Sequence, residues 1–99
     1  MTIKVGIVGL GVVGQRLIQQ FFKHKDYEIA ALCDLNESLC LKTSETFGNI
    51  PYFTNYSELV NDEEIELIYV AVPPKFHHKV VMAAFENGKH VLCEKPLAN

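Results

Sequence analysis

The sequence has little that would bring it to a membrane, a nucleic acid or the cell exterior. Its 9 basic and 12 acidic side chains leave a mildly negative balance, with no basic surface to attract a nucleic acid or a membrane. No positively charged region precedes the first apolar run, and that run is only a few residues long. It is too short for a signal-peptide core or a membrane span. We therefore expect a cytoplasmic protein with neither kind of partner.

Cysteine is also scarce. The three cysteines, Cys33, Cys40 and Cys93, are odd in number, and none is spaced as Cys-x-x-Cys. This spacing predicts neither a disulfide framework nor a metal site, and we expect reduced thiols. The chain shows no internal repeat or low-complexity segment. Its 99 residues form one domain, which can bury roughly 60–70% of its extended surface.

A glycine-rich turn stands near the start of the chain. The apolar run Ile3–Val8 leads into Gly9-x-Gly11-x-x-Gly14, and a helical pattern begins near Val12. In such a context the first glycine allows the tight turn, the second lets a diphosphate approach the backbone, and the third lets the helix pack closely. The helix N-terminus offers unpaired N–H groups and partial positive charge to an anion. Because ordinary tight turns also contain closely spaced glycines, the motif alone leaves both interpretations open.

An acidic residue ends the second predicted strand. Tyr27–Cys33 is an apolar run, and Asp34 follows it, 20 residues after Gly14. A carboxylate at this position can accept hydrogen bonds from the ribose of an adenosine. The alternative is that Asp34 caps the next helix, as aspartate often does. The order of strand, glycines, helix, strand and acid favours a dinucleotide site.

The rest of the chain alternates helices with strands. Helical patterns cover 12–25, 37–47, 56–60 and 75–87. Asn36 is the predicted cap of the helix at 37–47, and Asn55 is the predicted cap of the helix at 56–60. The inner stripe of the helix at 75–87 is predicted to be Phe76, Val80, Ala83 and Ala84. Strand patterns cover 51–53, 65–72 and His90–Cys93. Such alternation predicts an α/β fold, a doubly wound parallel sheet of about five strands in the order 3-2-1-4-5. Its ligand crevice lies at the carboxyl ends of strands 1 and 4.

Motifs at these strand ends are similar to a known family. The turn Gly6-Ile7-Val8-Gly9-Leu10-Gly11, the strand end Ala71-Val72-Pro73, His77, and the segment 88–98 with Glu94-Lys95-Pro96 stand in order along the chain. Together they resemble the N-terminal Rossmann domain of the Gfo/Idh/MocA family of NAD(P)-dependent oxidoreductases. The resemblance covers essentially the whole chain. It implies hydride transfer between a nicotinamide and a sugar, inositol or related polyol.

The resemblance also implies a set of site residues. The diphosphate would be lined by Gly9, Leu10, Gly11, Val12, Val13 and Gly14, the adenosine ribose would be held by Asp34, and the nicotinamide side would be formed by Val72, Pro73, Pro74 and His77. Lys95 would be the catalytic residue beside the reacting oxygen, and Glu94 would help to orient it. An ammonium can stabilise an oxygen that gains negative charge and can share a proton with it. The alternative for Lys95 is a solvated surface lysine.

Two neighbouring histidines start the fourth helical pattern. Adjacent helical residues point about 100° apart, so at most one of His77 and His78 can face the crevice comfortably. The family match selects His77 for a site role, and an exposed first-turn histidine is the alternative.

The sequence departs from the family pattern in two ways. Pro74 stands where many members have asparagine, which removes a donor near the nicotinamide ribose. The chain also stops at Asn99, before a sixth strand and the C-terminal substrate domain. We therefore expect residues 1–99 to be a truncated cofactor domain that does not turn over substrate by itself. The exposed edge of the fifth strand would favour a homo-oligomer.

Charge near Asp34 predicts the cofactor. A 2′-phosphate there would meet a like charge, and residues 35–39 offer Glu37 but no arginine or lysine to compensate. We expect NAD as the cofactor in preference to NADP. A non-catalytic NAD-binding regulatory or sensor module remains the alternative function, although such a module has no need of Lys95. Another Rossmann-like class, such as a methyltransferase or a CoA-binding domain, would not account for the Glu-Lys-Pro segment.

Overall fold

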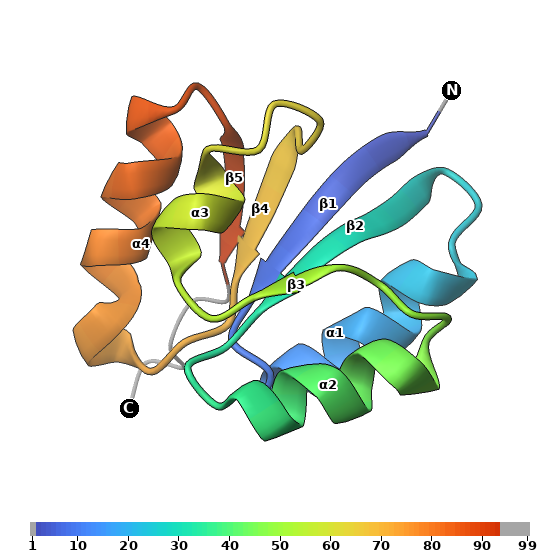
Figure 1. Cartoon of the computed structure of the whole chain (residues 1–99). Helices are drawn as coiled ribbons and strands as arrows, with labels where there is room; N and C mark the ends of the chain where they lie inside the picture. Colours follow the sequence, from blue (N-terminus) through green and yellow to red (C-terminus); the bar gives the residue numbers. More distant parts are fainter. Residues whose placement is uncertain (1, 94–99) are drawn as a thin grey trace, which may run out of the picture.

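A parallel sheet forms the middle of the molecule in the computed structural model, which describes residues 2–93. Within that range the sheet has five strands in the order β3-β2-β1-β4-β5 (Figure 1). The strands are β1 Ile3–Val8, β2 Tyr27–Cys33, β3 Tyr52–Phe53, β4 Leu67–Val70 and β5 His90–Cys93. The strand order and the parallel pairing confirm the predicted doubly wound sheet.

Strand β1 is central, and its last residue is level with the ends of both neighbours. Val8 pairs with Cys33 of β2 and with Val70 of β4. The Gly9 N–H then donates to the Cys33 carbonyl at 2.8 Å, and the Ala71 N–H donates to the Val8 carbonyl at 2.8 Å. The residues that follow the three strands therefore leave the sheet side by side, at its carboxyl edge.

Helices cover both faces of the sheet. Helices α1 (Val12–Lys23) and α2 (Glu37–Thr46) lie on one face, and α3 (Tyr56–Val60) and α4 (Pro74–Glu86) lie on the other (Figure 1). Side chains of β1 alternate between the two faces, as expected for a strand. Ile7 is buried in one cluster with Ile18 of α1, and Val8 is buried in the other with Val80 of α4. Burial on both faces explains the nearly continuous apolar strands.

The second and third helices begin at the predicted caps. The side-chain oxygen of Asn36 accepts a hydrogen bond from the Leu39 N–H at 3.1 Å. The side-chain oxygen of Asn55 accepts one from the Ser57 N–H at 3.0 Å. Each cap satisfies a backbone donor that the first turn of a helix leaves unpaired.

Two predictions for the second half of the chain need correction. Strand β4 spans Leu67–Val70, shorter than the predicted 65–72. Before the strand the Ile65 N–H donates to the Asp62 carbonyl in a turn, and after it the chain turns at Val72 into Pro73, which has no N–H to extend a ladder. The inner stripe predicted for α4 is correct for Val80 and Ala84, which are buried, and for Ala83, which is partly buried against the same cluster. It is wrong for Phe76, which is 43% exposed. Phe76 belongs to the first turn of α4, where the helix passes the end of the sheet.

Strand β5 is the last in the described sheet order and pairs with β4. Its Leu92 side chain is 46% exposed. Self-association through this edge stays a prediction. Among residues 2–93, no helix has both the length and the apolar character that crossing a membrane demands.

Candidate functional site

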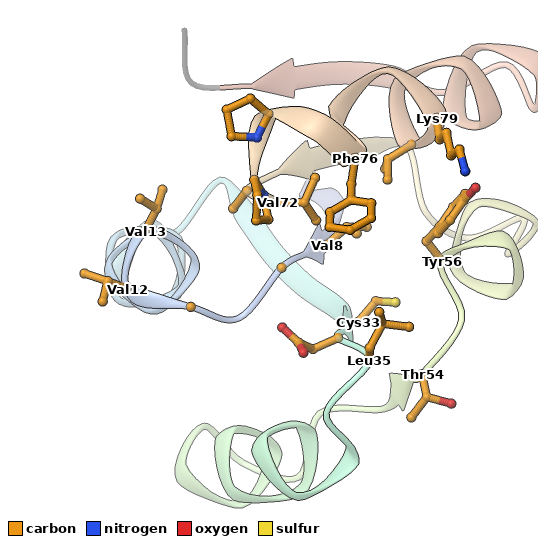
Figure 2. Close-up of a pocket in the computed structure, with 17 residues that line it drawn as sticks. Val8, Val12, Val13, Cys33, Leu35, Thr54, Tyr56, Val72, Phe76 and Lys79 are labelled. Atoms are coloured by element: carbon orange, nitrogen blue, oxygen red, sulfur yellow. The ribbon is translucent and has the colours of Figure 1, made fainter. Parts of the chain in front are cut away.

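A cavity of about 730 Å³ opens at the carboxyl edge of the sheet. It lies between the turn after β1, the end of β2 and the loop from β4 into α4 (Figure 2). Its walls are largely apolar, with Val8, Leu35, Val72, Phe76 and Val80 among the lining residues. This volume is within the range of pockets that hold small molecules and cofactors. The cavity is the crevice that the strand order predicts.

Two glycines of the turn are required by close backbone approaches. Gly9 has φ +104°, and a Cβ there would lie 2.6 Å from the carbonyl oxygen of Ala71. A Cβ on Gly14 would collide with the carbonyl oxygen of Gly9. In both cases the obstacle is main chain, which cannot swing aside as a side chain can. These positions therefore fix the turn and the approach of α1 to it.

Gly11 differs from the other two glycines of the motif. A Cβ added to Gly11 would have no atom within 4 Å, and Gly11 lines the cavity. The protein's own packing therefore does not require glycine here. A Cβ would instead occupy open space beside the backbone, which is the space that a bound diphosphate needs.

The N-terminus of α1 faces the same space. Gly11 is its N-cap and supplies no side-chain hydrogen bond, and the first turn contains no acidic residue. Val12 and Val13 of this turn also line the cavity. A helix N-terminus that carries no compensating carboxylate favours an anion through its free N–H groups and its dipole. The residues present thus fit the diphosphate of a dinucleotide.

Asp34 joins the glycine turn to the start of α2. Its Oδ2 accepts a hydrogen bond from the Leu10 N–H at 2.8 Å, and its Oδ1 accepts one from the Asn36 N–H at 2.9 Å. The cap of α2 is Asn36, so Asp34 does not play the alternative capping role. Asp34 lines the cavity. A carboxylate has about four lone-pair sites, which leaves acceptor capacity for ribose hydroxyls.

The predicted site residues fall into three groups in the structure. Those that line the cavity are Gly9, Gly11, Val12, Val13, Asp34, Val72, Pro73 and Pro74. Leu10 and Gly14 are buried beneath the turn, and His77 is half-buried and does not line the cavity. The Nε2 of His77 is buried without a hydrogen-bond partner among the described residues. Glu94 and Lys95 lie outside the described residues, and their roles stay predictions.

Sequence reasoning missed several residues that line the cavity. Helix α4 contributes Phe76, Lys79 and Val80, and the chain around α3 contributes Thr54 and Tyr56 (Figure 2). The signal in α4 was available, because positions i, i+3 and i+4 share one helical face. No local pattern marks Thr54 and Tyr56, since they reach the cavity only through the crossover that follows β3.

Cys33 lines the cavity, and burial disfavours ionisation of its thiol. Burial raises the pKa of Cys33 to about 12, and burial also raises the pKa of Cys40. At pH 8 a thiol with that pKa is ionised in only about one molecule in 10⁴. Cys93 is exposed.

We expect brief treatment with iodoacetamide at pH 8 to modify Cys93 alone, counted by intact mass. The unfolded chain, as control, should take up three groups, and rapid labelling of Cys33 in the folded chain would contradict its burial.

The glycine turn, the helix N-terminus and the acidic residue at one cavity define a dinucleotide-binding domain of the Rossmann type. A family model described as an oxidoreductase family with an NAD-binding Rossmann fold, Gfo/Idh/MocA, matches residues 3–99. The chain belongs to this family of NAD(P)-dependent oxidoreductases and forms its NAD(P)-binding domain.

Relatives and solved structures agree with this assignment. The chain is 35% identical over 100 residues to an inositol 2-dehydrogenase/D-chiro-inositol 3-dehydrogenase of Shouchella clausii, covering 99% of this chain and 29% of the relative. It resembles the myo-inositol dehydrogenase of Lactobacillus casei in complex with NAD(H) and myo-inositol, with a TM-score of 0.92, 26% identity, and coverage of 99% and 30%. It also resembles the biliverdin reductase of Synechocystis in complex with biliverdin and NADP+, with a TM-score of 0.88, 33% identity, and coverage of 97% and 30%. The chain thus spans between 29% and 30% of the length of these relatives.

Proposed function

We propose that this domain binds NAD and serves a dehydrogenase that acts on a sugar, inositol or related polyol. The observation that carries the proposal is the open space at Gly11, between two glycines that the backbone requires. The space beside Gly11, the N-terminus of α1 and the carboxylate of Asp34 all border the same cavity. The relatives that bind inositols support the substrate class.

In this proposal the chain's residues divide the work of binding. The turn from Gly9 to Gly11 and the first N–H groups of α1 hold the diphosphate, and Asp34 accepts hydrogen bonds from the adenosine ribose. Val72 and Pro73 form a wall on the nicotinamide side and exclude water from it. A nicotinamide bound there supplies the hydride acceptor or donor.

Lys95 carries the chemical step in the proposal. When a carbinol is oxidised, its carbon gives up a hydride and its hydroxyl gives up a proton, which leaves a carbonyl. The neutral amine of Lys95 would take that proton, and the ammonium so formed would stabilise the negative charge that develops on the oxygen. Glu94 would orient Lys95 through an opposite charge, and His77 would lie nearby on α4.

We propose a preference for NAD over NADP because of the charge of Asp34. A 2′-phosphate on the ribose would lie close to the carboxylate that accepts from Leu10 and Asn36. Two like charges about 5 Å apart repel by roughly 3 kcal/mol at an effective dielectric near 20, before screening by salt. That repulsion corresponds to a discrimination of up to about a hundredfold.

Calorimetric titration of the chain with NADH and then NADPH, at the same salt concentration, tests the proposal. We expect NADH to bind with a dissociation constant at least tenfold lower than that of NADPH. Equal affinities would contradict the role of Asp34 as the selector. Binding of neither, in a sample shown by circular dichroism to be folded, would overturn the dinucleotide site in this chain.

A further inference from the structure

The main chain of Leu10, at the centre of the glycine turn, is held from two sides by side chains. On one side Oδ2 of Asp34 accepts from the Leu10 N–H at 2.8 Å. On the other side the side-chain amide of Gln15 donates from Nε2 to the Leu10 carbonyl at 3.1 Å. The Leu10 side chain is 1% exposed. The turn is therefore anchored by main-chain and side-chain contacts while its cavity face stays open.

The Gln15 amide is itself fixed by a second contact. Its Nε2 also donates to Oγ1 of Thr43, in α2, at 2.9 Å, and Thr43 is 3% exposed. The orientation of the amide follows from its partners, because the Leu10 carbonyl can only accept and the amide nitrogen carries two hydrogens. Rotating the amide away would leave a buried hydroxyl and a carbonyl without this donor, which is costly. Gln15 thus ties the turn to both α1 and α2.

We propose that Gln15 is a positioning residue, which holds the glycine turn in the conformation that receives the diphosphate before any cofactor arrives. The inference rests on the proposed dinucleotide function. Gln15 is not among the residues that line the cavity, so it acts through Leu10 rather than on the ligand. The apparent dissociation constant of a ligand rises in inverse proportion to the fraction of protein in the competent conformation. Removing a contact that favours this conformation therefore weakens binding.

Gln15→Met is the variant of choice, because methionine has a similar length and a good helix propensity but no donor. We expect the dissociation constants of NADH and ADP to rise about tenfold, the effect of losing roughly one well-formed hydrogen bond. Adenosine, which has no phosphate, should bind equally weakly to both proteins. In the ligand-free protein, the Leu10 amide should exchange its hydrogen with solvent several-fold faster, measured by NMR. A residue that merely stabilised the fold would not separate ADP from adenosine in this way.

Gln19→Ala is the matched control, since Gln19 is an exposed glutamine of the same helix. It should leave all of these measurements unchanged. Equal NADH affinity in the wild type and in Gln15→Met would overturn the inference while the proposed function stands. If the wild type binds neither NADH nor ADP, the proposed function fails. The role of Gln15 can still be judged in that case, because an unchanged hydrogen-exchange rate of the Leu10 amide in Gln15→Met would show that Gln15 does not hold the turn.

Discussion

Replacing Gly14 with alanine should destabilise the domain by about 3 kcal/mol or more, the upper range for overpacking a closed site. The new Cβ would collide with the carbonyl oxygen of Gly9, and Gly9 is itself fixed by its approach to Ala71. Relief requires α1 to move away from the turn, which would expose Leu17 and Ile18, now buried against the sheet. Urea denaturation followed by circular dichroism measures the change.

Gly11→Ala is the control for this result, and it separates folding from binding. The backbone of Gly11, with φ −73° and ψ −161°, suits any residue, and its Cβ would contact nothing. We expect the free energy of unfolding to stay within about 1 kcal/mol of wild type. NADH affinity should fall more than tenfold, because the methyl group fills the space in which we propose that the diphosphate binds. A loss of stability as large as that of Gly14→Ala would show that the space beside Gly11 is not open. Undiminished NADH affinity would show that the diphosphate does not use that space.

Removing the charge of Asp34 should weaken the proposed preference for NADH over NADPH. In Asp34→Ser the NADPH-to-NADH ratio of dissociation constants should fall at least tenfold, because the repulsion of a 2′-phosphate is gone. The ratio is the informative quantity. Serine also disturbs the contact with the Leu10 N–H, which would weaken both cofactors together.

Asp34→Asn is the matched variant for that measurement. Asparagine keeps the shape and one acceptor oxygen but carries no charge. If charge decides the preference, Asn and Ser should lower the ratio by similar factors. A ratio that stays at the wild-type value in both variants would remove Asp34 from the selection of the cofactor. Titrations at two salt concentrations add a check, since salt screens the repulsion.

The elements of this fold could be predicted because each is specified locally. Apolar runs bounded by glycine, and asparagine caps three or fewer residues from their backbone donors, need no information from the rest of the chain. The alternation of strands and helices predicted a parallel sheet with right-handed crossovers, and the order 3-2-1-4-5 is the one typical of dinucleotide-binding folds. The glycine turn and Asp34 were found because they stand directly after strands.

The lining of the cavity could be predicted only in part. Phe76 looked like a core residue because helical spacing marks a face but not whether a sheet lies opposite that face. Lys79 was overlooked because charged helical residues are usually solvated, although it lies on the same face as Phe76. The contact from Gln15 in α1 to Thr43 in α2 joins residues 28 positions apart in sequence, and no local pattern encodes such a contact.

The central place of β1 has a consequence for the order of events during synthesis. Its pairing with β2 needs residues up to Cys33, but its pairing with β4 joins Val8 to Val70, 62 residues later. At about 5–20 residues per second, a ribosome takes roughly 2–7 seconds to add the 37 residues from Cys33 to Val70. During this time one side of an apolar strand has no native neighbour, and unpaired edges invite aggregation. The nascent domain is therefore most vulnerable in the interval between the second strand and the fourth.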